Sequence, residues 1–196
     1  DIRLGKGDEM ADYSYNYDIL GATVKTVSVF YYAGYRASNI LVTTDTAMNK
    51  SESYKTALIG SINRINGTSN LLSETFYNTS AGKGDEIADY SYNYKLTTLT
   101  VKTTTQYRYG ATFADASAAL TTDAMTRSDT YDGTGVVAAK LTSKTFYETR
   151  LGKGDEIADY SNNYASGGVT VKNTSVYYYN SLRASNLAVT IDTAMN

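Results

Sequence analysis

The chain has 196 residues, with 18 Lys and Arg against 20 Asp and Glu, and it contains 20 Tyr but no Cys, His, Pro or Trp. Without Cys or His there is no disulfide, no thiol nucleophile, no Ser-His-Asp triad and no zinc site of the usual ligand sets. A net charge of −2 without a basic stripe argues against nucleic acid as a partner. No apolar run approaches the roughly 18 residues of a membrane-spanning helix. We therefore expect no enzyme activity and no catalytic, cofactor-binding or metal-ligating residue.

Three segments in which aromatic residues alternate with small polar residues predict strands with their rings on one face. The aromatic positions are Tyr13, Tyr15 and Tyr17, then Tyr90, Tyr92 and Tyr94, then Tyr160 and Tyr164 with Asn162 between them. Enrichment in Tyr, Thr and Val without Pro favours strands elsewhere as well. We interpret the rings as cross-strand packing, in preference to a stacking platform for glycans or an adhesive, cross-linkable surface.

Three corresponding segments lie further along the chain. Ala116–Thr126 is rich in alanine, which leaves a short helix open, whereas its counterparts Asn39–Asn49 and Asn186–Asn196 have strand-like sequences. Because similar segments should share one structure, we expect the same conformation at all three.

A length difference marks the segment Lys55–Asn70. Tyr54 and Phe76 are 22 residues apart, whereas the corresponding Tyr131 and Phe146 are 15 apart, and the flanking sequences stay in register. An insertion of seven residues that is tolerated there predicts a surface connection.

The segment Val101–Tyr109 predicts another strand, with two different faces. The face expected to be buried carries Val101, Thr103, Thr105, Tyr107 and Tyr109, and the face expected to be solvated carries Lys102, Thr104, Gln106 and Arg108.

One motif recurs along the whole sequence. Gly-Lys-Gly-Asp-Glu begins at Gly5, Gly82 and Gly152, spaced 77 and 70 residues apart, and each copy continues into Ala-Asp-Tyr-Ser-x-Asn-Tyr. Such a period indicates a tandem array whose neighbouring units bury each other's apolar faces. We expect an elongated all-β protein, either an antiparallel hairpin array or a β-solenoid. Its repeat units would span residues 1–77, 78–147 and, in part, 148–196, as a window of a longer repetitive chain.

The acidic residues of the motif leave two alternatives open. Ca²⁺ could bridge the turns through Asp8, Glu9 and Asp12, through Asp85, Glu86 and Asp89, or through Asp155, Glu156 and Asp159. The spacing matches neither an EF-hand loop nor the calcium-binding nonapeptide, so a charged hairpin tip in which Lys offsets the carboxylates is the simpler interpretation. A paired-carboxylate glycosidase site is not expected in every copy of an array.

Several motifs occur together: Thr-Phe-Tyr followed by Ala-x-Tyr-x-x-x-Tyr, an aromatic run followed by Arg-Ala-Ser, and Thr-Tyr-Asp-Gly-x-Gly-x-Val. The combination resembles the YD-repeat (RHS-type) family of bacterial surface and toxin-associated proteins. Tyr131–Gly135 is similar to the Tyr-Asp-x-x-Gly core of that family, and Tyr31–Ala37 and Tyr178–Ala184 look like degenerate versions. The resemblance implies a long sheet of tandem hairpins, secreted or surface-displayed, without intrinsic catalysis.

These patterns predict a structural protein that forms an extracellular filament or a surface layer by stacking of its Tyr-rich repeats. Its partner would be itself, as a homopolymer or a continuous repeat chain. The alternative is a surface adhesin or a toxin-delivery shell that binds carbohydrate or protein through its Tyr-rich face or through Lys55–Asn70.

Overall fold

The computed structural model describes residues 4–196. Its regular secondary structure is almost entirely β, with 45% strand and 3% helix. Neighbouring strands run antiparallel, so the predicted all-β antiparallel class is confirmed. No solenoid coil is found in the part of the chain that the structure describes. The chain divides into two compact units, with the boundary between Lys102 and Thr103. The repeat boundaries at residues 77/78 and 147/148 concern the sequence period and stay a prediction.

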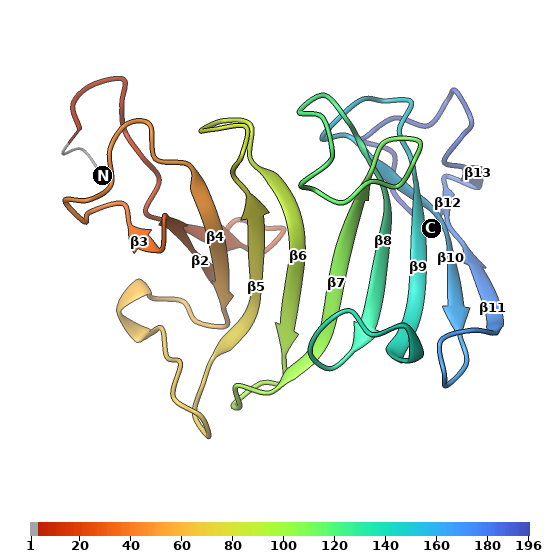
Figure 1. Cartoon of the computed structure of the whole chain (residues 1–196), viewed down its shortest axis with the longest axis horizontal. Coiled ribbons are helices and arrows are strands. Elements are labelled where there is room, and N and C mark those ends of the chain that lie inside the picture. Colours follow the sequence, from red (N-terminus) through yellow and green to blue (C-terminus); the bar gives the residue numbers. More distant parts are fainter. Residues whose placement is uncertain (1–3) are drawn as a thin grey trace. The chain divides into compact units, whose positions relative to one another are not determined.

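The first unit is a sheet in which sequential strands lie side by side (Figure 1). Its spatial order is β1, β2, β4, β5, β6, with β3 paired to β2. The elements are β1 (Tyr13–Tyr17), β2 (Val24–Tyr32), β3 (Tyr35–Arg36), β4 (Met48–Tyr54), the short 3₁₀ turn η1 (Ile59–Ser61), β5 (Leu71–Asn78) and β6 (Ile87–Tyr94).

In the second unit sequential strands again lie side by side, in the order β7, β8, β9, β10 and β11, and the unit carries the separate pair β12 and β13. The elements are β7 (Val101–Tyr109), β8 (Met125–Asp132), the 3₁₀ turn η2 (Ala138–Lys140), β9 (Leu141–Glu148), β10 (Ile157–Tyr164), β11 (Val171–Val176), β12 (Tyr178–Tyr179) and β13 (Leu182–Arg183). Three predicted strands are therefore present, at β1, β6 and β10, and β7 has the predicted bounds.

One face of the first sheet carries the rings, and we call it the aromatic face. Its cross-strand rows are Tyr31, Lys50, Phe76 and Tyr90, then Val29, Glu52, Glu74 and Tyr92. Phe76 stacks on Tyr90 with ring centroids 4.7 Å apart, and Tyr92 meets Tyr90 at 5.2 Å. The rings of the alternating series thus pack across strands, which is the interpretation that the sequence favoured.

The opposite face carries short polar side chains, and we call it the hydroxyl face. Ser51, Thr75 and Ser91 form one of its rows. Tyrosines of adjacent strands lie over these serines: Tyr77 Oη is 3.1 Å from Ser51 Oγ, and Tyr147 in the second unit repeats the contact with Ser128. The contact with Tyr147 explains why Ser128 is buried although it is polar.

The segments Asn39–Asn49, Ala116–Thr126 and Asn186–Asn196 are neither helix nor strand over most of their length, and their hydrogen bonds agree at Asn39 and Asn186 but differ at Ala116. They consist mainly of turns, and β4 and β8 begin only at Met48 and Met125. The Asn39 Oδ1 atom accepts a hydrogen bond from the Leu41 backbone, and Val42 N donates to Asn39 O. These local bonds of Asn replace the sheet ladder, so the strand-like reading of Asn39–Asn49 was wrong.

The connection Lys55–Asn70 is mostly exposed, as the insertion predicts, and it joins β4 to β5. It also folds back, because Ile59 and Ile62 pack against the buried cluster of Val27, Val29, Tyr54 and Leu71. The insertion is therefore both a surface loop and part of the cover of the aromatic face.

The face of β7 that was expected to be solvated is not uniformly so, since Thr104 is only 1% exposed. Thr104 Oγ1 donates to Gly133 O at 2.7 Å and accepts from Gly135 N at 2.9 Å. The turn Asp132–Gly135 lies over this hydroxyl, so a turn of the neighbouring hairpin buries it. The alternation of residue types along β7 does not indicate that a distant turn buries one of its side chains.

Candidate functional site

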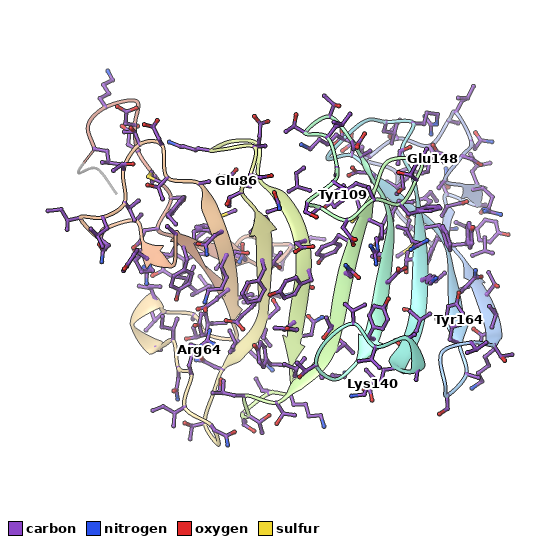
Figure 2. The ribbon with its side chains drawn as sticks, viewed as in Figure 1. Arg64, Glu86, Tyr109, Lys140, Glu148 and Tyr164 are labelled. Carbon is purple, nitrogen blue, oxygen red and sulfur yellow. The ribbon has the colours of Figure 1, made fainter. Side chains whose placement is uncertain are left out.

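The glutamate of the recurring motif ties two segments together. Glu86 Oε2 accepts a hydrogen bond from Gly84 N within its own turn at 3.0 Å, and its Oε1 accepts one from Met48 N, the first residue of β4, at 2.9 Å. Figure 2 shows Glu86 at the turn that joins β5 and β6. We call this double contact the glutamate staple.

The second unit contains the same staple. Glu156 accepts from Gly154 N at 3.0 Å and from Met125 N, the first residue of β8, at 2.8 Å. The glycines of the motif have a clear role, because Gly82 and Gly84 have φ of 95° and 90°, values that suit only glycine. The motif is thus a tight turn that holds the start of a strand in a neighbouring hairpin.

The last acid of the motif also binds a protein donor in two copies. Asp12 accepts two hydrogen bonds from the Arg36 guanidinium, with N···O distances of 2.6 and 2.5 Å, and Asp159 accepts from Arg183 at 2.7 to 2.9 Å. The bond to Asp12 raises the pKa of Arg36. At the matching distance after Asp89 the sequence has Phe113 instead of Arg. Among residues 4–196 no group of three or more His, Cys, Asp or Glu side chains is arranged to hold a metal ion.

Two carboxylates are buried on the aromatic face of the first unit, where Glu52 is 2% and Glu74 5% exposed. Glu52 and Glu74 face each other across β4 and β5. Their hydrogen-bond partners are three tyrosine hydroxyls and two cationic side chains. We call the two glutamates and these five partners the glutamate–tyrosine cluster: Tyr31, Lys50, Glu52, Tyr54, Arg64, Glu74 and Tyr94.

Glu52 binds the most donors in this cluster. Its Oε2 accepts from Tyr31 at 2.8 Å and from Tyr54 at 2.5 Å, and its Oε1 lies 2.6 Å from Lys50 Nζ. Lys50 Nζ also lies 4.4 Å from the centre of the Tyr31 ring, within cation–π range. Each polar atom of the cluster that is buried thus has a charged or hydroxyl partner, as burial of a carboxylate requires.

Hydrogen bonding sets the protonation of these groups. Burial by itself raises the pKa of Glu52, but the hydrogen bonds from Lys50, Tyr54 and Tyr31 outweigh it and lower the pKa to about 2. Burial and the bond to Glu52 raise the pKa of Tyr31 to about 12. The same causes raise the pKa of Tyr54, and burial with the bond to Glu74 raises that of Tyr94. Glu52 therefore stays ionised and the three phenols stay neutral near pH 7.

The insertion supplies one of the two cations. Arg64 reaches from the Lys55–Asn70 connection and bonds both carboxylates, with its Nη1 atom 2.8 Å from Glu74 Oε1 (Figure 2). The sequence analysis missed this cluster. The period-two pattern Lys50-Ser51-Glu52-Ser53-Tyr54 could have revealed that three functional side chains share a face, but nothing local indicates Arg64.

The second unit has a different cluster at the corresponding place on β8. Asp129, 2% exposed, receives a bidentate bond from Arg127 at 2.7 and 2.8 Å, and Arg108 Nε lies 3.6 Å from it. Arg108 also bonds Asp115, and Arg127 lies 4.4 Å from the ring centre of Phe113. We call this the arginine–aspartate cluster.

A cavity of about 330 Å³ opens beside the η2 turn of the second unit. Its wall includes Asp132, Lys140, Thr142, Tyr164 and Gly167, and Figure 2 labels Lys140 and Tyr164. An aromatic ring beside charged and hydroxyl groups can contact a small polar molecule such as a sugar.

No protein-family model matches this chain, and neither a curated protein nor a solved structure is found to be similar to it. Within residues 4–196, no helix is long and apolar enough to cross a membrane. What the fold and the site define is therefore an antiparallel all-β protein in which turn glutamates hold strand starts and the sheet face carries buried, paired charges.

Proposed function

We propose that this chain is a structural protein that builds an extracellular filament or surface layer from stacked, Tyr-rich β repeats, with copies of itself as its partner. The observation that carries the proposal is the glutamate staple, which occurs with the same two bonds in both units. A motif that recurs at a long period and makes the same pair of contacts at Glu86 and at Glu156 serves architecture, since a catalytic group is needed only once. The resemblance to YD-repeat proteins, with secretion or surface display, belongs to this proposal.

Electron microscopy and fibre diffraction of the purified chain test it. Ordered filaments or layers with a strand spacing of about 4.7 Å are expected. The triple substitution of Tyr90, Tyr92 and Tyr94 by Ser should weaken that order, because Tyr90 stacks on Phe76 and Tyr92 packs against both of these rings. Particles that stay monodisperse at every concentration would contradict the proposal, as would turnover of glycans or peptides by the pure chain.

A second candidate is a surface adhesin or toxin-delivery shell that binds carbohydrate or protein. Two observations favour it: the cavity beside Lys140 and Tyr164, and the exposed apolar residues Leu58 and Ile65 on the Lys55–Asn70 connection, which are 62% and 69% exposed. Screening the chain against a glycan array, with Tyr164→Ala as the matched variant, separates the candidates. Specific glycan binding that Tyr164→Ala abolishes would favour the adhesin.

A further inference from the structure

The connections between the strands of the first unit lie at two opposite ends of its sheet. Because sequential strands run antiparallel side by side, successive connections alternate between the two ends (Figure 1). One end carries residues 18–23, 55–70 and 95–100, and the other carries residues 37–47 and 79–86. Arg64 and Glu86 mark these two ends in Figure 2.

The first of these ends is basic, and we call it the basic end. Lys55 and Lys95 are exposed there, and Asp18 is the one acid of its three connections. Two of the connections are joined, because the backbones of Ser69 and Thr97 exchange two hydrogen bonds, at 2.9 and 3.3 Å. The same connections carry exposed aliphatic side chains: Ile19, Leu20, Leu58, Ile65, Leu96 and Leu99.

The opposite end is acidic, and we call it the acidic end. Asp45 and Asp85 are exposed there, and Lys83 is the one base of its two connections. The glutamate staple from Glu86 to Met48 N holds the turn 79–86 beside the strand start that follows residues 37–47. This end also carries two exposed aliphatic side chains, Ile40 and Leu41.

The second unit, taken by itself, shows a similar division. The connections that correspond to the basic end, residues 133–140 and 165–170, carry exposed valines and Lys140 without any acid. The connections 110–124 and 149–156 correspond to the acidic end and carry the exposed Leu120. Their charged residues are four acids and two bases: Asp115, Asp123, Asp155, Glu156, Arg150 and Lys153. A division that recurs in both units is a property of the repeat.

We propose that the basic end of the first unit binds the acidic end of a second copy of this chain, so that copies join end to end along the strand direction. Opposite charge and exposed apolar side chains make the two ends complementary. A second copy matches both ends, whereas an anionic lipid surface would match only the basic end. The proposal rests on the proposed structural function and adds the contact in a second direction that a layer needs besides the stacking of sheets.

Two charge-reversed variants test the contact. Lys55→Glu with Lys95→Glu makes the basic end acidic, and Asp45→Lys with Asp85→Lys makes the acidic end basic. All four side chains are exposed, so both variants should keep the circular dichroism spectrum of the parent chain.

Sedimentation velocity at low salt is the measurement. The parent chain should associate, each variant alone should associate at least about tenfold more weakly, and an equimolar mixture of the two variants should associate like the parent. Association of each variant alone at the strength of the parent overturns the proposal, as does a mixture that stays dissociated.

A further variant separates the specific contact from general attraction between oppositely charged chains. Leu58→Ser with Ile65→Ser is added to the first variant, because these side chains are 62% and 69% exposed and would be buried in the contact. We expect association in the mixture to weaken at least about tenfold. An unchanged mixture overturns the proposal.

The remaining outcomes distinguish this contact from other partners and from the structural function. A parent chain that stays monomeric but sediments with phosphatidylserine vesicles overturns the proposal in favour of a lipid surface. Filaments or layers that form equally well from each variant alone remove the end-to-end contact and leave the structural function standing. Charge-dependent association without filaments or layers does the reverse.

Discussion

The two units place a buried carboxylate at the same position of corresponding strands and stabilise it differently. Glu52 on β4 faces Glu74 across the strand pair, whereas Asp129 on β8 faces Lys144. In the first unit two carboxylates therefore need two cations, and one of these, Arg64, comes from the insertion. In the second unit, where the connection is short, Arg127 and Arg108 of the sheet itself approach the single carboxylate.

The difference shows how a repeat can vary without loss of a buried charge. A carboxylate removed from water is tolerated only with charged or hydrogen-bonding partners. The added acid Glu74 and the added base Arg64 therefore belong together, and we expect neither to be replaceable alone.

The largest effect is expected from Glu74→Lys, which gives the first unit the residue of the second. The new ammonium would lie beside Lys50 and Arg64 with Glu52 as the remaining carboxylate of the cluster, and Tyr94 would lose its acceptor. We expect a loss of about 3–5 kcal/mol in the free energy of unfolding. Urea titration followed by circular dichroism measures it.

The reciprocal change Lys144→Glu is its control. The substituted carboxylate would lie across from Asp129, with Arg127 and Arg108 close by, so a loss of within about 1 kcal/mol is expected. Similar losses for the two variants would show that the clusters do not depend on their charge balance.

The next largest effect is expected from Arg64→Ala. Both carboxylates would stay buried while losing a charged donor, at a cost of about 1–3 kcal/mol. Lys55→Ala, in the exposed start of the same connection, should change stability by within about 0.5 kcal/mol. If neither variant changes the free energy of unfolding, the insertion does not stabilise the cluster.

Lowering the pH should destabilise the parent chain more than the variant Glu52→Gln. The pKa of Glu52 falls from its ordinary value of 4.5 to about 2 in the folded chain. Between these two pH values the unfolded state binds more protons than the folded state, so the free energy of unfolding decreases as the pH is lowered. The contribution of Glu52 is complete above pH 4.5 and is lost as the pH falls toward 2. Melting temperatures between pH 5 and 2 should fall less steeply for Glu52→Gln, and parallel curves would refute the ionised, hydrogen-bonded Glu52.

The smallest effect concerns the row beside the clusters. Thr104 faces Tyr131 where Val27 faces Tyr54, and both Thr104 and Val27 are buried. Thr104→Val therefore keeps the volume but removes the bonds to Gly133 and Gly135, at about 1 kcal/mol. Lys102→Ala on the same strand, where the side chain is exposed, should cost less. A neutral Thr104→Val would mean that the turn does not depend on this hydroxyl.

Several parts of the fold and site were predictable because they are local. The alternation around Tyr92 predicted β6, and the bounds of β7 matched the pattern of Val101–Tyr109. The candidate site was not predictable to the same extent. Glu86 was assigned to a charged hairpin tip, but its second partner, Met48, is 38 residues away, and no local pattern identifies it.

By itself, the sequence determined the antiparallel strands, the glycine turns with positive φ and the ring stacks, since side-chain alternation and backbone conformation depend on neighbouring residues. The tertiary structure decided which carboxylates are buried and which groups neutralise them: Arg64 is 12 residues from Glu52 and belongs to a loop, and Thr104 is buried by a turn 29 residues away. The turns of Asn39–Asn49 are also local, because hydrogen bonds of Asn39 there satisfy backbone groups that a strand would pair, although the apolar pattern of that segment favoured a strand. Burial and charge pairing depend on which distant segments the fold brings together, and the period of a strand contains no information about its cover.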